Sequence, residues 1–411
     1  MEAVQLFEKN EPDRAIALIN KYLPQASDEE KVSIVDIYIQ WGFLDEAISI
    51  LTALTNKYPQ ESELKVMLAD LYIEVNKDEE AMLLLNEITS DDDVYLQALV
   101  QLADLYQAQG LFEVAEQKLI AAKQIDPTEE IIDFALGELF FSTGDYVKAI
   151  TYYEKIKSLN IADVSISERL AECYATTGKY EKALNYYKDL KSDDPDILFK
   201  YGFTAAQTDR NDIAINTWEK VIEKDPYYHS VYFELAKIYE KEELIEEAYK
   251  ATIKGLEVDE FNKKLYLLAG KLAHQLGKND ESDKWVSEAI SLDPEYKEAI
   301  LFKIEFLKEN EDYSTIIDFI TYIQSEGADD PLYNWELARA YKKTESYNKA
   351  LNHYNEAYNN LNNDSDFLKE YGYFLIEEGR TEGGIAIFEA YLKLIPDDFE
   401  IEELIQRFKQ V

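Results

Sequence analysis

Apolar and small residues recur along this chain with a period of 34 residues, which is marked by one position that is usually Ala and precedes an apolar residue. Successive marks lie 34 residues apart, except for a first step of 32 and a sixth step of 31. We call them anchors: Ala15, Ala47, Ala81, Ala115, Ala149, Ala183, Ala214, Ala248, Ser282, Ile316, Ala350 and Gly384. A fixed period of this length predicts a repeat protein whose units pack on their neighbours.

Each period contains two amphipathic patterns with helical spacing. Thirteen, twelve and nine residues before the anchor stand an apolar, a small and an aromatic residue, as in Leu170, Ala171 and Tyr174 before Ala183. Apolar residues follow four and seven positions after the anchor. Both spacings place apolar side chains on one face of a helix, so the pattern predicts two helices per repeat.

Glycine and proline stand where two helices per repeat have to end. Glycine lies five residues before six anchors, at Gly42, Gly110, Gly144, Gly178, Gly277 and Gly379. This position predicts the left-handed residue that ends a helix. Proline lies twelve residues after six anchors, at Pro59, Pro127, Pro195, Pro226, Pro294 and Pro396, where it is expected to close the second helix.

These residues resemble the tetratricopeptide repeat, as LAECYATTGKYEKALNYYKDLKSDDP at 170–195 illustrates. In its length and acidity, the chain is similar to long tetratricopeptide repeat arrays of the bacterial type. The resemblance implies an all-α, right-handed solenoid of about twelve helix pairs. It also implies that the first helices line a concave groove that binds extended or helical peptides.

The short step near 192–198 suggests a division of the array. It predicts an N-terminal segment 1–194, a C-terminal segment 195–396 and a capping helix 397–411, with Phe399, Leu404, Ile405 and Phe408 on one side. The alternative is a shortened loop without consequence.

Composition narrows the range of partners. The 411 residues include 42 Lys and Arg against 83 Asp and Glu, a net charge of −41. This charge argues against nucleic acid and anionic membranes as partners. The single Cys excludes a disulfide framework. No apolar run of spanning length and no signal peptide is visible, so we expect a cytoplasmic protein without membrane insertion.

No catalytic motif is present, and the three His lie in different repeats that a solenoid cannot bring together. We therefore expect no enzyme activity, no cofactor and no metal.

Charge on the predicted groove changes sign along the chain. Eleven residues before the anchors, the first half carries Asp36, Asp70, Asp104, Glu138 and Glu172, and the second half includes Lys237, Lys271 and Arg339. Fifteen residues before the anchors stand apolar residues that include Val32, Val66, Val100, Phe134, Phe199, Phe233 and Trp335. The groove is therefore expected to bind basic amphipathic segments in the first half and acidic–aromatic segments in the second.

Two functions fit this pattern. The first is a non-enzymatic scaffold or adaptor that holds protein segments in its groove, and the second is a regulator that responds to a peptide or small ligand. Relatives that act as chaperone adaptors hold a terminal carboxylate with Lys and Asn at these groove positions. In most repeats of the first half, these two positions hold Val and Asp or Phe and Glu instead. This difference argues against a chaperone-adaptor role.

Overall fold

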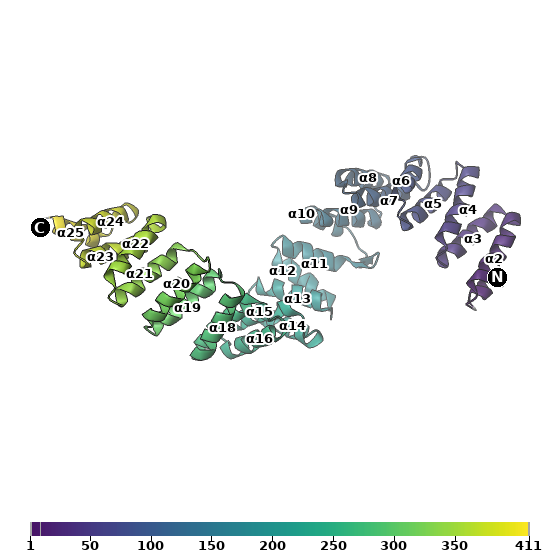
Figure 1. Cartoon of the computed structure of the whole chain (residues 1–411). Coiled ribbons are helices and arrows are strands. Elements are labelled where there is room, and N and C mark those ends of the chain that lie inside the picture. Colours follow the sequence, from purple (N-terminus) through teal and green to yellow (C-terminus); the bar gives the residue numbers. More distant parts are fainter. Residues whose placement is uncertain (1, 9, 410–411) are drawn as a thin grey trace. The chain divides into compact units, whose positions relative to one another are not determined.

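The paired helical patterns fold as a stack of antiparallel helices in the structure, a computed structural model that describes residues 2–8 and 10–409 (Figure 1). The described residues form twelve helix pairs and one further helix, so the predicted all-α solenoid is confirmed. Two compact units, Met1–Asp193 and Asp194–Val411, divide the chain inside the segment 192–198. That this junction unfolds more easily than the rest stays a prediction.

The first unit contains six helix pairs, a 3₁₀ turn and a hairpin. They are α1 (Glu2–Glu8), α2 (Pro12–Tyr22), η1 (Leu23–Gln25), α3 (Asp28–Gln40), α4 (Leu44–Lys57), α5 (Ser62–Glu74), α6 (Asp78–Asn86), α7 (Tyr95–Ala108), α8 (Phe112–Ile125), α9 (Glu130–Ser142), α10 (Tyr146–Tyr153), β1 (Asn160–Ile161), β2 (Val164–Ser165), α11 (Ile166–Thr176) and α12 (Tyr180–Leu190).

The second unit contains six pairs and the last helix. They are α13 (Pro195–Ala206), α14 (Asn211–Lys224), α15 (His229–Lys241), α16 (Ile245–Val258), α17 (Lys263–Gln275), α18 (Asn279–Leu292), α19 (Lys297–Glu309), α20 (Tyr313–Ser325), α21 (Pro331–Lys343), α22 (Tyr347–Leu361), α23 (Ser365–Glu377), α24 (Thr381–Leu394) and α25 (Phe399–Lys409). We call the members of each pair the first and the second helix.

All twelve anchors are buried between the two helices of their repeat. Where Ser282 replaces Ala, its hydroxyl donates to the Gly270 carbonyl at 2.8 Å, so the buried polar group is satisfied. Where the residue twelve before the anchor is Gly, the side chain four after the anchor fills the space. Gly202 and Trp218 form such a pair, as do Gly137 and Tyr153.

Every turn within a helix pair contains one left-handed residue, five positions before the anchor. The six predicted glycines have φ between +71° and +80°. The same backbone conformation is adopted by Asn10, Asn76, Asp209, Glu243, Glu311 and Glu345. The turn geometry therefore belongs to the repeat and not to glycine, although glycine adopts it at lower cost.

Two second helices are short. Helix α10 ends at Tyr153 and is followed by the antiparallel hairpin of β1 and β2, whose turn residues Ala162 and Asp163 both have positive φ. Helix α6 ends at Asn86. Neither repeat has proline twelve residues after its anchor, and the sequence pattern did not predict the hairpin.

One helix boundary differs from the sequence prediction. Pro195 was expected to close a second helix, but it begins α13, whose cap Asp194 accepts a hydrogen bond from the Asp196 backbone N–H at 2.8 Å. Because only 31 residues separate Ala183 from Ala214, the proline position that follows the second helix of one repeat is also the first position of the next helix.

Helix α25 packs on the last repeat through buried Ile401 and Ile405. Phe399, expected on the packed side, is instead 69% exposed, because the buried side of the helix is defined by Ile401, Leu404, Ile405 and Phe408. Residues 410 and 411 of the predicted cap lie outside the described residues.

Candidate functional site

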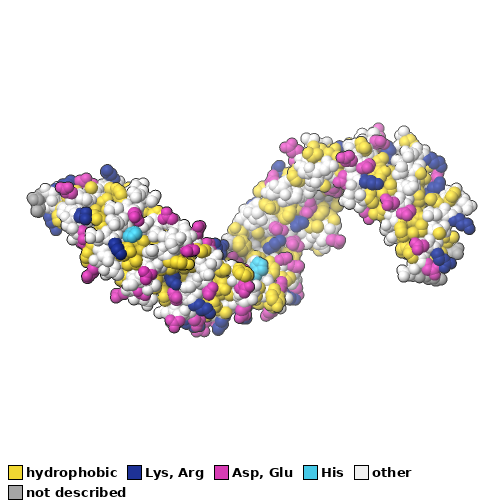
Figure 2. All heavy atoms as spheres, viewed as in Figure 1, with side chains coloured by type: hydrophobic (Ala, Val, Ile, Leu, Met, Phe, Trp, Pro, Cys, Tyr) yellow, Lys and Arg dark blue, Asp and Glu magenta, His cyan; other side chains and the backbone are white. Residues whose placement is uncertain are grey.

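In each repeat, the two predicted groove positions stand four residues apart on the first helix, a spacing that places them on one side of it. We call this side the first-helix face. In the first unit, α3, α5 and α7 present Asp36, Asp70 and Asp104, and all three side chains are exposed. Val32 and Val100 are half-buried beside them, whereas Val66 is buried. Figure 2 shows acidic side chains distributed widely over the visible surface. Exposed acids are therefore common on this protein, and the three aspartates stand out by their regular spacing along the chain.

These three carboxylates have no cationic partner. Within the described ranges, no Lys or Arg nitrogen lies within 4.0 Å of Asp36, Asp70 or Asp104, although the Gln101 amide donates to Asp70. Loss of surrounding water raises the pKa of Asp70 and of Asp104. A raised pKa means that the charged form is disfavoured here, and a nearby cation would reverse the effect.

The last two acids of the row have a different environment. Arg169 donates from Nε and Nη2 to Glu138 at 2.8 and 3.1 Å, and the Tyr153 hydroxyl donates to Glu138 at 2.5 Å. Arg169 Nη1 also lies 4.0 Å from Glu172, and its guanidinium lies 4.5 Å from the Phe141 ring centroid. The structure therefore separates the predicted row of five into three acids without a cation and two that share Arg169.

Sequence reasoning missed the residues that complete this face. Arg169 and Gln101 both lie fourteen positions before an anchor, and each reaches the acid of the preceding repeat. Ile39, Ile73 and Phe141 stand eight positions before their anchors and are half-buried. They extend the apolar strip that Val32 and Val100 begin on this face. The missing signal was a pairing of positions 31 residues apart, which is visible only if both offsets are compared between repeats.

In the second unit, two predicted groove residues belong to an internal network. Trp335 is 8% exposed, and the Arg339 guanidinium lies 4.0 Å from its ring centroid. Arg339, the Trp335 indole N–H and the Tyr354 hydroxyl all donate to Glu370, at 2.5 to 3.0 Å. Burial raises the pKa of Glu370, but the hydrogen bonds and positive charge of Arg339, together with the bonds from Tyr354 and Trp335, outweigh burial. The pKa therefore lies below its usual value. Trp335 and Arg339 thus join α21, α22 and α23.

The remaining predicted residues of the second unit are more accessible. Phe199 and Phe233 are half-buried, and Lys237 is exposed with its ammonium 5.6 Å from the Phe233 ring centroid. Lys271 is half-buried. Phe203, eleven residues before Ala214 and therefore at the same groove position as Lys237, is 43% exposed.

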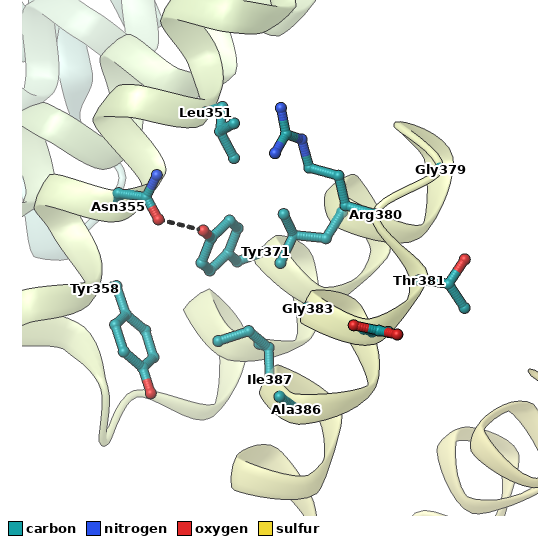
Figure 3. A pocket seen from close by; sticks show the side chains of 12 residues that line it. Leu351, Asn355, Tyr358, Tyr371, Gly379, Arg380, Thr381, Gly383, Ala386 and Ile387 are labelled. Carbon is teal, nitrogen blue, oxygen red and sulfur yellow. Dashed lines mark hydrogen bonds between the residues drawn. The ribbon is translucent and has the colours of Figure 1, made fainter. Parts of the chain in front are cut away.

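A cavity of about 740 Å³ lies among α22, α23 and α24 (Figure 3). Leu351, Leu375 and Ile387 supply apolar walls, and Arg380 lies at its edge. The Tyr371 hydroxyl is already bonded to Asn355 at 2.7 Å. The lining contains no pair of acid and base groups poised for proton transfer.

Two further observations concern the described residues. They contain no group of three or more His, Cys, Asp or Glu side chains arranged to hold a metal ion. No helix among them is both long enough and apolar enough to cross a bilayer.

The fold and the repeat grammar define a class of helical repeat protein, and the chain belongs to the tetratricopeptide repeat family. Family models match residues 331–398 (YpiA-like, C-terminal tetratricopeptide repeats), 107–161 (YpiA-like, tetratricopeptide repeats) and 42–100 (tetratricopeptide repeat). One relative is the TPR repeat-containing protein YpiA of Bacillus subtilis (strain 168). It is 39% identical over 412 residues, which cover 99% of this chain and 97% of the relative.

Solved structures match part of the chain. A crystal structure of MamA is 20% identical with a TM-score of 0.38 and covers 41% of this chain and 94% of its own. A crystal structure of YrrB, described as a TPR protein with an unusual peptide-binding site, is 15% identical with a TM-score of 0.40. It covers 45% of this chain and 97% of its own.

Proposed function

We propose that this chain is a non-enzymatic scaffold that binds a basic amphipathic protein segment on the first-helix face of its first unit. Tetratricopeptide repeats form scaffolds for protein interaction, and the family assignment supports the same general role here. The segment would place Lys or Arg against Asp36, Asp70 and Asp104 and apolar side chains against the strip formed by Val32 and Val100.

One observation carries this proposal: three successive repeats present an exposed aspartate that has no cation beside it. Elsewhere on the same face, the acid Glu138 is satisfied within the protein by Arg169. A bound Lys or Arg would give the three aspartates a cationic partner, as Arg169 gives Glu138. It would also lower the raised pKa of Asp70 and Asp104.

The expected energy is modest. Exposed charge pairs contribute about 0.2–1 kcal/mol each, so three would contribute roughly 0.6–3 kcal/mol. That range corresponds to about a threefold to hundredfold change in affinity. Apolar contacts must supply the rest, and binding should weaken as salt is added but not vanish.

The test compares two triple variants in the whole chain. One replaces Asp36, Asp70 and Asp104 with Asn. The control replaces Asp45, Glu79 and Glu113, exposed acids on second helices, with Asn or Gln and changes the net charge equally. Binding of a labelled peptide of alternating Lys and Leu is measured by fluorescence anisotropy.

We expect the first variant to bind at least about threefold more weakly and the control to bind like the unchanged protein. Equal affinities for both variants, or binding that is independent of salt, would contradict the proposal. Glu138→Gln is expected to lower stability rather than peptide affinity, because it breaks the contact with Arg169.

A further inference from the structure

A second surface of the second unit carries the opposite charge. Helix α16 and the turn after α17 enclose a hollow of about 560 Å³. Its apolar lining consists of Tyr249, Ile253 and Leu276, and three lysines, Lys250, Lys254 and Lys278, surround it. Glu246 is the single carboxylate in this lining. The lining of the hollow therefore carries three cationic side chains and one anionic side chain in a protein of net charge −41.

Two of these lysines have no internal partner. In the part of the chain that the structure describes, no carboxylate lies within 4.0 Å of the ammonium groups of Lys250 or Lys254, and both side chains are exposed. They stand one helical turn apart, where like charges destabilise a helix. Glu219, Glu223 and Glu247 line an adjoining hollow that the two lysines share, but none forms an ion pair with them.

The third lysine is held in place. Its ammonium lies 4.6 Å from the Tyr249 ring centroid and 3.7 Å from Glu281. The Tyr249 hydroxyl donates to Glu281 and accepts a hydrogen bond from the Trp285 indole N–H at 3.0 Å. This network fixes the aromatic wall of the hollow and places one cation at its edge before any ligand binds.

The residue pattern shared by the repeats does not explain this arrangement of lysines. Lys250 and Lys254 lie two and six residues after the anchor Ala248, and no other repeat has Lys at both positions. The equivalent residues in the next repeat are Lys284 and Glu288, and in the one after it Asp318 and Tyr322. The pair is therefore a local feature of α16.

We infer that this hollow is a docking site for an acidic protein segment that inserts one large apolar side chain against Tyr249, Ile253 and Leu276 and places carboxylates on Lys250, Lys254 and Lys278. Charge complementarity selects the occupant, because Lys250 and Lys254 have no carboxylate of the described residues within 4.0 Å and stand beside an apolar floor. A short segment is favoured over a nucleic acid, since the net charge of −41 repels an extended polyanion. The site is separate from the face proposed for basic segments.

The test uses the full chain with ¹³C-labelled Ile and Leu methyl groups and NMR titration. The probe is the peptide Ac-GEEWEEG-NH₂, and its controls replace all Glu with Gln or Trp with Ala. One variant carries Lys250→Ala, Lys254→Ala and Lys278→Ala. The matched variant carries Lys220→Ala, Lys264→Ala and Lys393→Ala, three exposed lysines of the same unit, and has the same net charge.

We expect saturable shifts of the Ile253 and Leu276 methyl signals with the acidic Trp peptide and much weaker ones with either control peptide. The hollow variant should lose about tenfold in affinity, while the matched variant should not change. No saturable shift up to about 1 mM peptide, or equal weakening in both variants, would overturn the proposal. Saturable shifts with laurate or ATP but not with the peptide would also overturn it, because they would assign the hollow to a small anion.

Discussion

Gly202 on α13 faces the indole of Trp218 on α14, and this contact offers the sharpest test of how the repeats pack. A Cβ atom added at Gly202 would lie 2.4 Å from Trp218 Nε1 and 2.7 Å from Cδ1. Ordinary contacts between such atoms are about 3.5–4.0 Å, so the ring or the helix would have to move by about 1 Å. Overpacking of this kind costs roughly 1–3 kcal/mol.

A displaced indole would lose a second interaction. Trp218 is fully buried, and its N–H donates to the Phe199 carbonyl at 3.1 Å. Breaking this bond in the interior adds about 1 kcal/mol. We therefore expect Gly202→Ala to lower the free energy of local unfolding by about 2–4 kcal/mol.

The assay is hydrogen exchange of α13 and α14, because repeat arrays need not unfold in one step. Two other repeats suggest a rescue variant: Ala69 and Ala103 stand at the repeat position of Gly202, and Leu85 and Leu119 stand at that of Trp218. Adding Trp218→Leu to Gly202→Ala should therefore cost less than the sum of the two single changes. An unchanged exchange pattern in Gly202→Ala, or costs that simply add, would refute the steric reasoning.

Three further expectations follow from the structure. Glu243→Gly, at φ +62°, should stabilise its turn by about 1 kcal/mol, as measured by exchange protection; lower protection would contradict the assigned turn. Asp398 accepts bonds from Lys369 and Tyr391, at 2.7 Å each, which lower its pKa to about 2. Its stabilising effect is therefore present above the unfolded pKa of about 3.9 and is lost as the pH falls towards 2. Protection of α25 should fall over that range but not in Asp398→Asn, and identical pH profiles would refute the assignment. Segment 192–198 should show a minimum of protection and early proteolysis, whereas uniform protection across it would leave it a plain loop.

The sequence alone determined the architecture. The anchors, the apolar positions around them and the glycines in the turns all repeat with the period of one helix pair, so each repeat independently predicts the same local fold. That redundancy is why Ser282, Ile316 and Gly384 could replace Ala without misleading the prediction. The repeated pattern did not predict the hairpin after α10, because the hairpin occurs in a single repeat of the described chain.

The candidate site depended on tertiary structure. A periodic pattern assigns side chains to a face, but it does not say which of them are satisfied by a neighbouring repeat. The offset pattern treated Asp36 and Glu138 alike, and Lys237 and Arg339 alike. Packing distinguished them, because Glu138 meets Arg169 of the next first helix and Arg339 meets Glu370. The physical reason is that charge pairing between repeats depends on two residues 31 positions apart, whereas helix formation depends on residues three and four apart.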